Sequence, residues 1–215
     1  MKNLDKKWKG SDTIVNNIEQ VINRYKEFAP EYNLATLEWG YESPNIISDL
    51  ASHHLSKKLK IIDAGCGSGL CAQSLSNKGY KNIVGFDISP DMLQLAYSSQ
   101  CYSMVNIVDM LKQPYPYLSN YFDGLTCGGV LSFFTDITPI IKEFFRIVKS
   151  GGILIFTLRD DLYKKYKQDE LFSNLIDQGN MELIEALRDQ PYLPNHLDYG
   201  NEIRITYYVF RILKI

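Results

Sequence analysis

The segment IIDAGCGSG, residues 61–69, places three glycines directly after a run of apolar residues. Gly65, Gly67 and Gly69 lack a Cβ atom, so the backbone there can adopt positive φ angles and pass close to a bound molecule. A helix that begins after such a turn presents free N–H groups and the positive end of its dipole to an anion. The segment therefore predicts a strand-to-helix turn that binds an anionic group, such as a pyrophosphate or a carboxylate.

Three acidic residues, Asp63, Asp87 and Asp109, each stand at the end of a predicted strand. Asp87 follows Gly65 by 22 residues, close to the spacing of about 20 expected for an acid that binds ribose hydroxyls. Since carboxylates accept hydrogen bonds, Asp63 is a candidate partner for an amino group and Asp109 for the amino group of an adenine. The neighbouring Met110 N–H is a candidate donor to an adenine ring nitrogen. Because parallel strands end at one edge of a sheet, the three acids are expected at a single ligand-binding edge.

The elements that must position these acids follow from an alternation of strand-like and helix-like segments. Short apolar runs predict strands near 59–63, 82–87, 103–108, 122–127 and 152–158. Helices fit near 69–78, 90–99 and 137–148. This order predicts βαβ units and a parallel sheet with helices on both faces. Residues 182–188 and 202–213 predict two further strands at one edge, one of them antiparallel.

The chain before the first strand has helical rather than strand-like periodicity. Apolar residues between Ile14 and Phe28 fall on one helix face, with Asp12 as a candidate N-cap and Pro30 marking the end. A second helix is expected at about residues 44–54. We therefore expect one domain over residues 1–215. Its parts are an N-terminal helical cover (1–57), a cofactor-binding core (58–160) and a C-terminal part with the last two strands (161–215).

Composition excludes several classes of protein. The formal net charge is −2, so no global basic field attracts nucleic acid or an anionic membrane. No apolar run approaches the roughly 20 residues that span a bilayer, and the charged N-terminus does not resemble a secretory signal. The cysteines form neither a CxxC pair nor a zinc-ligand pattern. These features predict a cytoplasmic protein with reduced thiols and no metal site.

Four segments, IDAGCGSG, FDISPDML, FDGLTCGGVLSFF and VKSGGILIFT, together resemble the class I S-adenosylmethionine-dependent methyltransferases over about residues 20–160. YKEFAPEYN and WGYESP also resemble a narrower group, related to the methyltransferase-like protein encoded in the Williams–Beuren syndrome critical region. The resemblance implies a Rossmann-like fold with a seven-stranded, mostly parallel sheet and one antiparallel edge strand. It also implies S-adenosylmethionine as the cofactor and S-adenosylhomocysteine as the product.

The same resemblance implies roles for residues at matching positions. The methionine-binding loop would hold one end of the cofactor, the strand ends its ribose and adenine, and the helical cover two tyrosines. The implied cofactor-binding residues are Tyr25, Tyr32, Asp63, Gly65, Cys66, Gly67, Gly69, Asp87, Ile88, Asp109, Met110, Cys127 and Gly128. Among them, Ile88 would lie beside the adenine, and Cys127 and Gly128 would lie at the sulfonium end.

The acceptor of the methyl group is less well defined by the sequence. The fourth strand ends in CGGV rather than in an Asn/Asp-Pro-Pro-Tyr or Pro-Cys motif, which argues against methylation of DNA bases or of protein glutamine. We therefore expect direct in-line transfer to a small molecule. Candidate catalytic residues are His196 as a base, Arg159 as an anchor for an acidic substrate, and Tyr41 as an aromatic face. The simpler interpretations are an exposed loop histidine, an ion pair with Asp160 or Asp161, and helix packing.

Two alternatives remain open at this point. An NAD(P)-dependent oxidoreductase would share the fold, but Leu70 follows GCGSG, so the GxGxxG pattern is incomplete. A regulatory or repurposed protein that binds the cofactor without transferring methyl is the other, because a fold does not fix a function.

Overall fold

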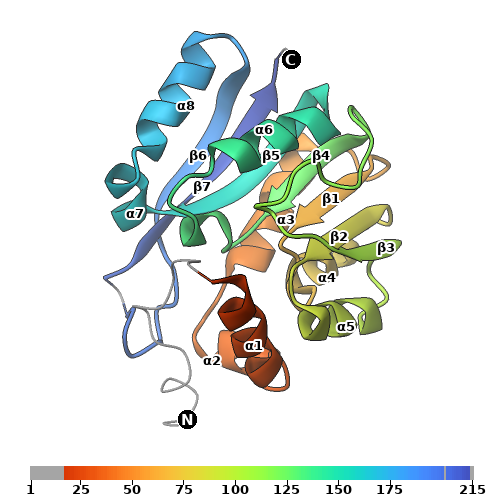
Figure 1. The fold of residues 1–215 in the computed structure, drawn as a ribbon, viewed down its shortest axis with the longest axis vertical. Helices are drawn as coiled ribbons and strands as arrows, with labels where there is room; N and C mark the ends of the chain where they lie inside the picture. Colours follow the sequence, from red (N-terminus) through yellow and green to blue (C-terminus); the bar gives the residue numbers. More distant parts are fainter. Residues whose placement is uncertain (1–16, 201, 214–215) are drawn as a thin grey trace.

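The computed structural model of the protein describes residues 17–200 and 202–213. These residues contain a seven-stranded sheet with the strand order β3-β2-β1-β4-β5-β7-β6 (Figure 1). The strands are β1 (Ile61–Ala64), β2 (Ile83–Asp87), β3 (Met104–Ile107), β4 (Phe122–Cys127), β5 (Val148–Arg159), β6 (Met181–Pro191) and β7 (Arg204–Ile212). All seven predicted strands are confirmed, with ends shifted by a few residues.

Strands β1 to β5 are parallel, whereas β7 runs antiparallel to both of its neighbours, β5 and β6. The antiparallel pairs lie at the β6 end of the sheet, so the predicted mostly parallel sheet is confirmed. β1 lies between β2 and β4, with β2 and β3 on one side and β4 and β5 on the other. Open α/β sheets bind ligands outside the carboxyl ends of their strands at such a reversal of strand order.

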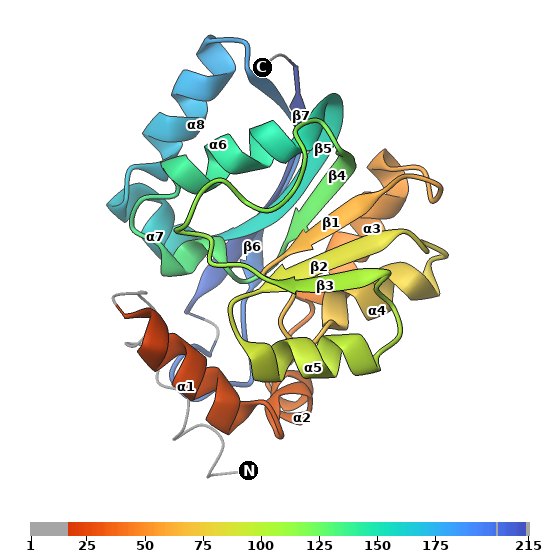
Figure 2. The ribbon, with the colours of Figure 1, turned by 45° about the vertical axis from the view of Figure 1, so that its right-hand side comes forward.

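Helices cover both faces of this sheet (Figure 2). They are α3 (Ser43–His54), α4 (Leu70–Asn77), α5 (Pro90–Ser98), α6 (Thr138–Ile147), α7 (Asp160–Lys165) and α8 (Gln168–Asp177). α3 and α4 pack on one face through a buried cluster that includes Ile47 and Leu75. α6 and α8 pack on the other through Phe144 and Phe172, and Phe172 stacks on Phe156 of β5 with ring centroids 5.5 Å apart. Because both faces are covered, the central strands are mainly apolar, and the acids Asp63 and Asp87 lie at or near their carboxyl ends.

An N-terminal cover, made of α1 (Ile18–Phe28) and α2 (Tyr32–Glu38), lies outside the two helix layers (Figure 2). The Asn17 side chain accepts hydrogen bonds from the N–H groups of Glu19 and Gln20 and so caps α1. The predicted N-cap, Asp12, and the predicted first apolar residue, Ile14, lie outside the described residues. α1 ends close to the predicted position, but α2 was not predicted, because it is short and has no capping side chain.

The loop between β6 and β7 completes this cover. Leu193 and Tyr199 of the loop share a buried cluster with Phe28 and Trp39. The Asn195 N–H donates to the Trp39 carbonyl oxygen at 3.2 Å, which fixes the loop on the end of α2. The cover is therefore built from segments near the two ends of the chain. Among the described residues, no helix is long and apolar enough to cross a membrane.

A largely buried ion pair holds the loop between β3 and β4. Glu143 Oε2 accepts the Tyr115 N–H at 2.8 Å and a hydrogen bond from Arg146 at 2.8 Å. Arg146 also donates to the carbonyl oxygens of Tyr115 at 3.0 Å and Tyr117 at 2.8 Å. The Tyr115 hydroxyl donates to the Met110 carbonyl oxygen at 2.9 Å, so the ion pair positions the segment that follows β3.

Replacing Glu143 by Gln should lower the free energy of unfolding by about 1–3 kcal/mol at pH 7, because charge-assisted hydrogen bonds are lost. Burial raises the pKa of Glu143, but the hydrogen bonds from Arg146 and the Tyr115 N–H lower it more, so the pKa lies below its ordinary value. A lowered pKa stabilises the fold above the unfolded-state pKa, and this stabilisation is lost as the pH falls. Urea unfolding at pH 7 and pH 3 should therefore show a smaller difference between the two proteins at pH 3.

The exposed pair of Glu170 and Lys167, whose side chains are 63% and 75% exposed, provides the control. Glu170→Gln should change stability by less than about 0.5 kcal/mol at either pH. An equal loss for Glu143→Gln at pH 7 and pH 3 would contradict the role given to the ion pair.

Candidate functional site

Two adjoining cavities lie at the carboxyl edge of the sheet, beneath the N-terminal cover. The large cavity has a volume of about 130 Å³ and the small cavity about 40 Å³. Five residues line both: Tyr32, Tyr41, Gly65, Gly67 and Gly128. The predicted glycine turn therefore lies where the two cavities meet.

The three glycines of this turn all have positive φ angles, of 67° at Gly65, 52° at Gly67 and 93° at Gly69. Gly65 and Gly67 line both cavities. A Cβ atom on Gly65 would lie 2.6 Å from a methyl carbon of Val130, so only glycine fits there. Gly69 lines neither cavity; a Cβ atom there would lie 3.1 Å from the Cα of Ala96. Gly69 therefore provides close packing rather than a ligand contact.

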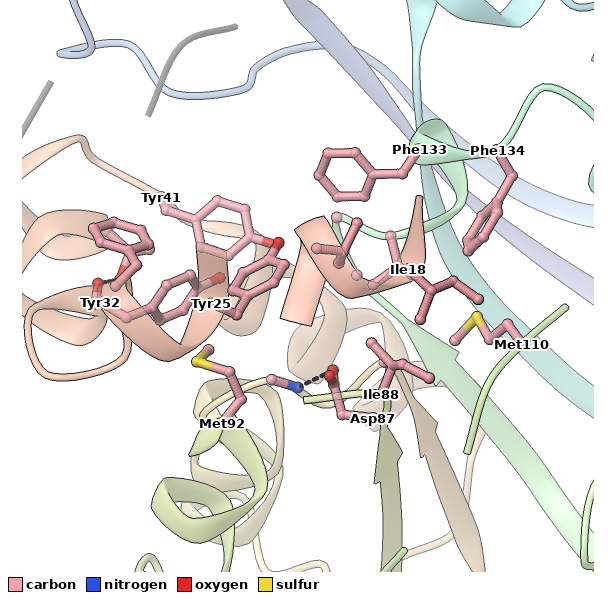
Figure 3. A pocket seen from close by; sticks show the side chains of 18 of the residues that line it. Ile18, Tyr25, Tyr32, Tyr41, Asp87, Ile88, Met92, Met110, Phe133 and Phe134 are labelled. Atoms are coloured by element: carbon pink, nitrogen blue, oxygen red, sulfur yellow. Dashed lines mark hydrogen bonds between the residues drawn. The ribbon is translucent and has the colours of Figure 1, made fainter. Parts of the chain in front are cut away.

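Asp87 joins the end of β2 to the glycine turn (Figure 3). Its Oδ2 accepts the Gly67 N–H at 2.9 Å, and its Oδ1 accepts the Ser89 N–H at 2.9 Å. Burial raises the pKa of Asp87, and the backbone N–H groups of Ser89, Gly67 and Ile88 partly oppose that rise. Each carboxylate oxygen has two lone pairs, so Asp87 can accept further hydrogen bonds from a ligand in the large cavity.

Asp63 lies at the small cavity, where its residue surface is only 1% exposed. The Tyr102 hydroxyl donates to its Oδ2 at 2.7 Å and the Thr126 hydroxyl to its Oδ1 at 2.8 Å. Burial raises the pKa of Asp63, whereas these two hydrogen bonds lower it in part. Asp63 is thus a buried carboxylate held by neutral donors.

Asp109 and Met110 line the large cavity beyond the end of β3, as does Ile88 beyond β2. Asp109 Oδ1 accepts the Leu111 N–H at 2.9 Å. Its Oδ2 is buried without a hydrogen-bond partner among the described residues, and the Lys112 ammonium lies 3.7 Å away. A buried acceptor beside apolar side chains suits the amino group of a flat heterocycle.

Three tyrosines of the cover face the cavities. Tyr25 and Tyr32 lie with ring centroids 6.3 Å apart, and Tyr41 lies at the junction of the two cavities (Figure 3). Burial raises the pKa of Tyr32 to about 12 and raises the pKa values of Tyr25 and Tyr41 well above the ordinary value. The phenols are therefore protonated at neutral pH, where they can donate hydrogen bonds but not act as bases.

Three further predicted residues lie outside both cavities: Cys127, His196 and Arg159. Cys127 is fully buried in the core at the end of β4. His196 is only 1% exposed and packs against the rings of Trp39 and Tyr199 with centroids 4.7 and 4.9 Å away, so the interpretation as an exposed loop histidine is wrong. The prediction missed this burial because Trp39 lies far away in the sequence.

Arg159 forms the ion pair that the simpler interpretation predicted, with Asp161. Its Nε and Nη2 donate to the two carboxylate oxygens at 3.0 and 2.7 Å, and its guanidinium lies 5.3 Å from the centre of the Tyr199 ring. Arg159 is 8% exposed, so it is buried rather than solvated, and it does not line either cavity. Asp161 therefore occupies the edge of the guanidinium formed by Nε and Nη2.

Most of the wall of the large cavity was not predicted. Its additional residues are mainly apolar: Ile18, Val21, Phe28, Thr36, Met92, Val108, Leu111, Gly129, Val130, Phe133, Phe134, Tyr192 and Leu193. The helical periodicity of α1 identified its apolar face, although only Tyr25 on this helix was assigned to the site. In the structure that face covers the cavity. For the loop residues Tyr192 and Leu193 the sequence contains no comparable signal.

Comparisons with known proteins agree with this geometry. Residues 62–156 match the family model of a methyltransferase domain. The chain is 30% identical over 170 residues to the ubiquinone biosynthesis O-methyltransferase of Nitrosomonas europaea, covering 75% of this chain and 68% of that protein. It is 27% identical over 170 residues to human methyltransferase-like protein 27, covering 77% and 69%. The latter match confirms the resemblance to the Williams–Beuren group.

A solved structure, that of the [4+2]-cyclase SpnF, has the same fold. It superposes with a TM-score of 0.71 and 15% identity, over 93% of this chain and 98% of that chain. The parallel sheet, the glycine turn at its carboxyl edge and the matching relatives lead to one conclusion. The chain belongs to the class I S-adenosylmethionine-dependent methyltransferases, and its cofactor is S-adenosylmethionine.

Proposed function

We propose that the protein transfers the methyl group of S-adenosylmethionine directly to a small, uncharged and largely apolar acceptor bound in the large cavity. The observation that carries this proposal is the wall of that cavity. Its only charged side chains among the described residues are Asp87 and Asp109, and the rest of the wall is mainly aliphatic or aromatic. An anionic acceptor would find no cation there, whereas a flat apolar molecule would bury its surface.

The chemistry of the residues that line the two cavities supports this placement of the cofactor. The free lone pairs of Asp87 would accept the ribose hydroxyls. Asp109 Oδ2, which accepts no hydrogen bond from the described residues, would accept one from the adenine amino group between Ile88 and Met110. Gly65 and Gly67 leave room for the aminocarboxypropyl end beside Asp63 in the small cavity. Tyr25 and Tyr32 would cover the cofactor from α1 and α2.

When bound, S-adenosylmethionine supplies a methyl group on a positively charged sulfur, so the protein has to align the acceptor rather than activate the donor. Alignment of two reacting groups can lower a barrier by roughly 7–11 kcal/mol. The Tyr41 hydroxyl lies at the end of β4, 2.6 Å from the position that a Cβ atom on Gly129 would take. From there its protonated phenol would donate to a polar atom of the acceptor. Its ring would also face the methyl group, a contribution of about 0.5–2 kcal/mol for a cation on an aromatic face.

The relatives support a small-molecule acceptor. The name of the Nitrosomonas europaea protein places its activity in the biosynthesis of ubiquinone, a small molecule. Residues Ile18, Val21 and Tyr25 of helix α1 line the large cavity, so an acceptor there would bind beneath the helical cover. We therefore propose neither nucleic acid nor protein as the acceptor.

A second candidate is cofactor binding without methyl transfer. It is favoured by the likeness to SpnF, which is described as a [4+2]-cyclase rather than as a methyltransferase. An apolar cavity beside the cofactor could bind a substrate for other chemistry equally well. Formation of S-adenosylhomocysteine during turnover distinguishes the two, because it accompanies only methyl transfer.

Replacing Asp87 by Ala should raise the dissociation constant for S-adenosylhomocysteine about 10- to 100-fold, because hydrogen bonds from the ribose to a charged acceptor are worth about 1.5–3 kcal/mol. Calorimetric titration measures this change, with thermal melting to verify folding. Asp177→Ala, at the exposed end of α8, is the matched control and should bind like the wild type. Unchanged affinity in the Asp87 variant, or binding of NADH by the wild type, would contradict the cofactor placement.

The character of the acceptor can be tested with a matched pair of probes, 1-naphthol and 1-naphthoate. With S-adenosylhomocysteine bound, 1-naphthol should bind at least about 10-fold more tightly than 1-naphthoate. The reason is that burial of an unpaired carboxylate costs more free energy than a change in affinity of about 10-fold represents. Phe133→Ala should weaken 1-naphthol binding several-fold and leave the affinity for S-adenosylhomocysteine unchanged. Leu118→Ala, which alters a side chain 72% exposed outside the cavity, should do neither. Equal binding of the two probes would refute an uncharged acceptor.

A further inference from the structure

We propose that Tyr102 is a positioning residue for cofactor binding, whose hydroxyl orients Asp63 toward the amino group of the cofactor. The proposal rests on the cofactor placement given above. Tyr102 lies just before β3 and does not line either cavity; its hydroxyl reaches the site by donating to Asp63, and its ring packs beside Cys66 of the glycine turn.

The Asp63 carboxylate is held from two sides. The hydrogen bond from Tyr102 is 2.7 Å long and that from Thr126 on β4 is 2.8 Å long, one to each oxygen. These bonds fix the plane of the carboxylate at the end of β1. Each oxygen keeps a second lone pair for a further donor. Asp63 therefore faces the small cavity in one orientation, with capacity for an ammonium group.

Two glycines make room for the Tyr102 ring. A Cβ atom on Gly85, in the middle of β2, would lie 2.7 Å from ring carbon Cε1 of Tyr102. A Cβ atom on Gly69, which precedes α4, would lie 3.1 Å from ring carbon Cε2. The ring thus passes through a slot between β2 and the start of α4 to reach Asp63. The third glycine of the GCGSG turn serves this slot rather than the cofactor itself.

The charge on Asp63 has no counterpart in the protein. Among the described residues Asp63 makes no ion pair, and its partners are neutral: the hydroxyl groups of Tyr102 and Thr126 and the thiol of Cys71. A buried carboxylate with such partners gains most from a cation that arrives with a ligand. The α-ammonium group of an amino acid, as in the cofactor, has this chemistry and reaches the small cavity in the proposed placement.

The test is Tyr102→Phe, which keeps the ring in its slot and removes only the hydroxyl. Two probes are titrated calorimetrically: S-adenosylhomocysteine, and 5′-methylthioadenosine, which lacks the amino and carboxyl groups. The dissociation constant of the first should rise about 5- to 10-fold, less than for direct loss of a hydrogen bond to a charged group, because Tyr102 acts through Asp63, while that of the second changes less than about twofold. Tyr97→Phe, at a side chain 75% exposed on α5, is the control and should alter neither.

A pH profile provides a second readout that loss of packing would not change. Without the Tyr102 hydroxyl the charged form of Asp63 is less stable, so its pKa rises and S-adenosylhomocysteine binding falls at a higher pH than in the wild type. The other groups that face Asp63 are Thr126, Cys66, Cys71, Cys127 and Asp87, none of which is changed by the substitution. The acid limb of binding should therefore move upward in Tyr102→Phe alone.

The outcomes separate the two proposals. If the wild type does not bind S-adenosylhomocysteine, the proposed function fails before Tyr102 is tested. If the wild type binds it and Tyr102→Phe weakens both probes equally, or weakens neither, the positioning role is overturned. Selective weakening of the probe that carries the amino group supports it.

Discussion

The hydrogen bond from the Gly67 N–H to the Asp87 carboxylate connects the glycine turn after β1 to the end of β2. The turn after β1 could adopt several conformations, because its glycines tolerate positive φ angles at little cost. Asp87, at the end of β2, holds it in one of them. From the opposite side the Ser68 hydroxyl donates to Asn33 of α2 at 2.5 Å, which ties the same turn to the cover. The glycine turn is thus bonded both to the end of β2 and to helix α2 of the cover, on opposite sides of the cavities.

The polar and the apolar residues of the site serve different proposed ligands, the acids the cofactor and the apolar residues the methyl acceptor. The acids Asp63, Asp87 and Asp109 all lie at or just beyond strand ends, where the cofactor is proposed to bind. The remaining wall comes from α1, from the segment after β4 and from the loop between β6 and β7, and it is mainly apolar. A site of this kind draws its specificity for the cofactor from the sheet and its specificity for the acceptor from the cover. The acceptor can therefore differ between relatives whose sheets are alike.

Much of the sheet and of its ligand-binding edge could be predicted from the sequence, and the reason is local. Strands buried on both faces are continuous apolar runs, and the acids at their ends stand at fixed distances from the glycine turn. The cover could not be predicted in the same way. Whether Tyr192 lines the cavity, or His196 is buried, depends on contacts with α1 and α2 more than 150 residues earlier in the chain. Gly69 belongs to the conspicuous turn, yet its packing against Tyr102 depends on a third segment.

The cover and the glycine turn differ in how far apart in the sequence their contacting segments lie. The glycine turn and the ends of β1 and β2 are close in sequence and can form early, since local contacts require little loop closure. The cover, by contrast, requires the loop between β6 and β7 to contact the end of α2. An example is the hydrogen bond from the Asn195 side chain to the carbonyl oxygen of Glu38, 157 residues earlier in the chain. That meeting requires β7 to be inserted between β5 and β6. The large cavity is therefore closed by contacts between segments far apart in the sequence, whereas the glycine turn depends on contacts between segments that are close in sequence.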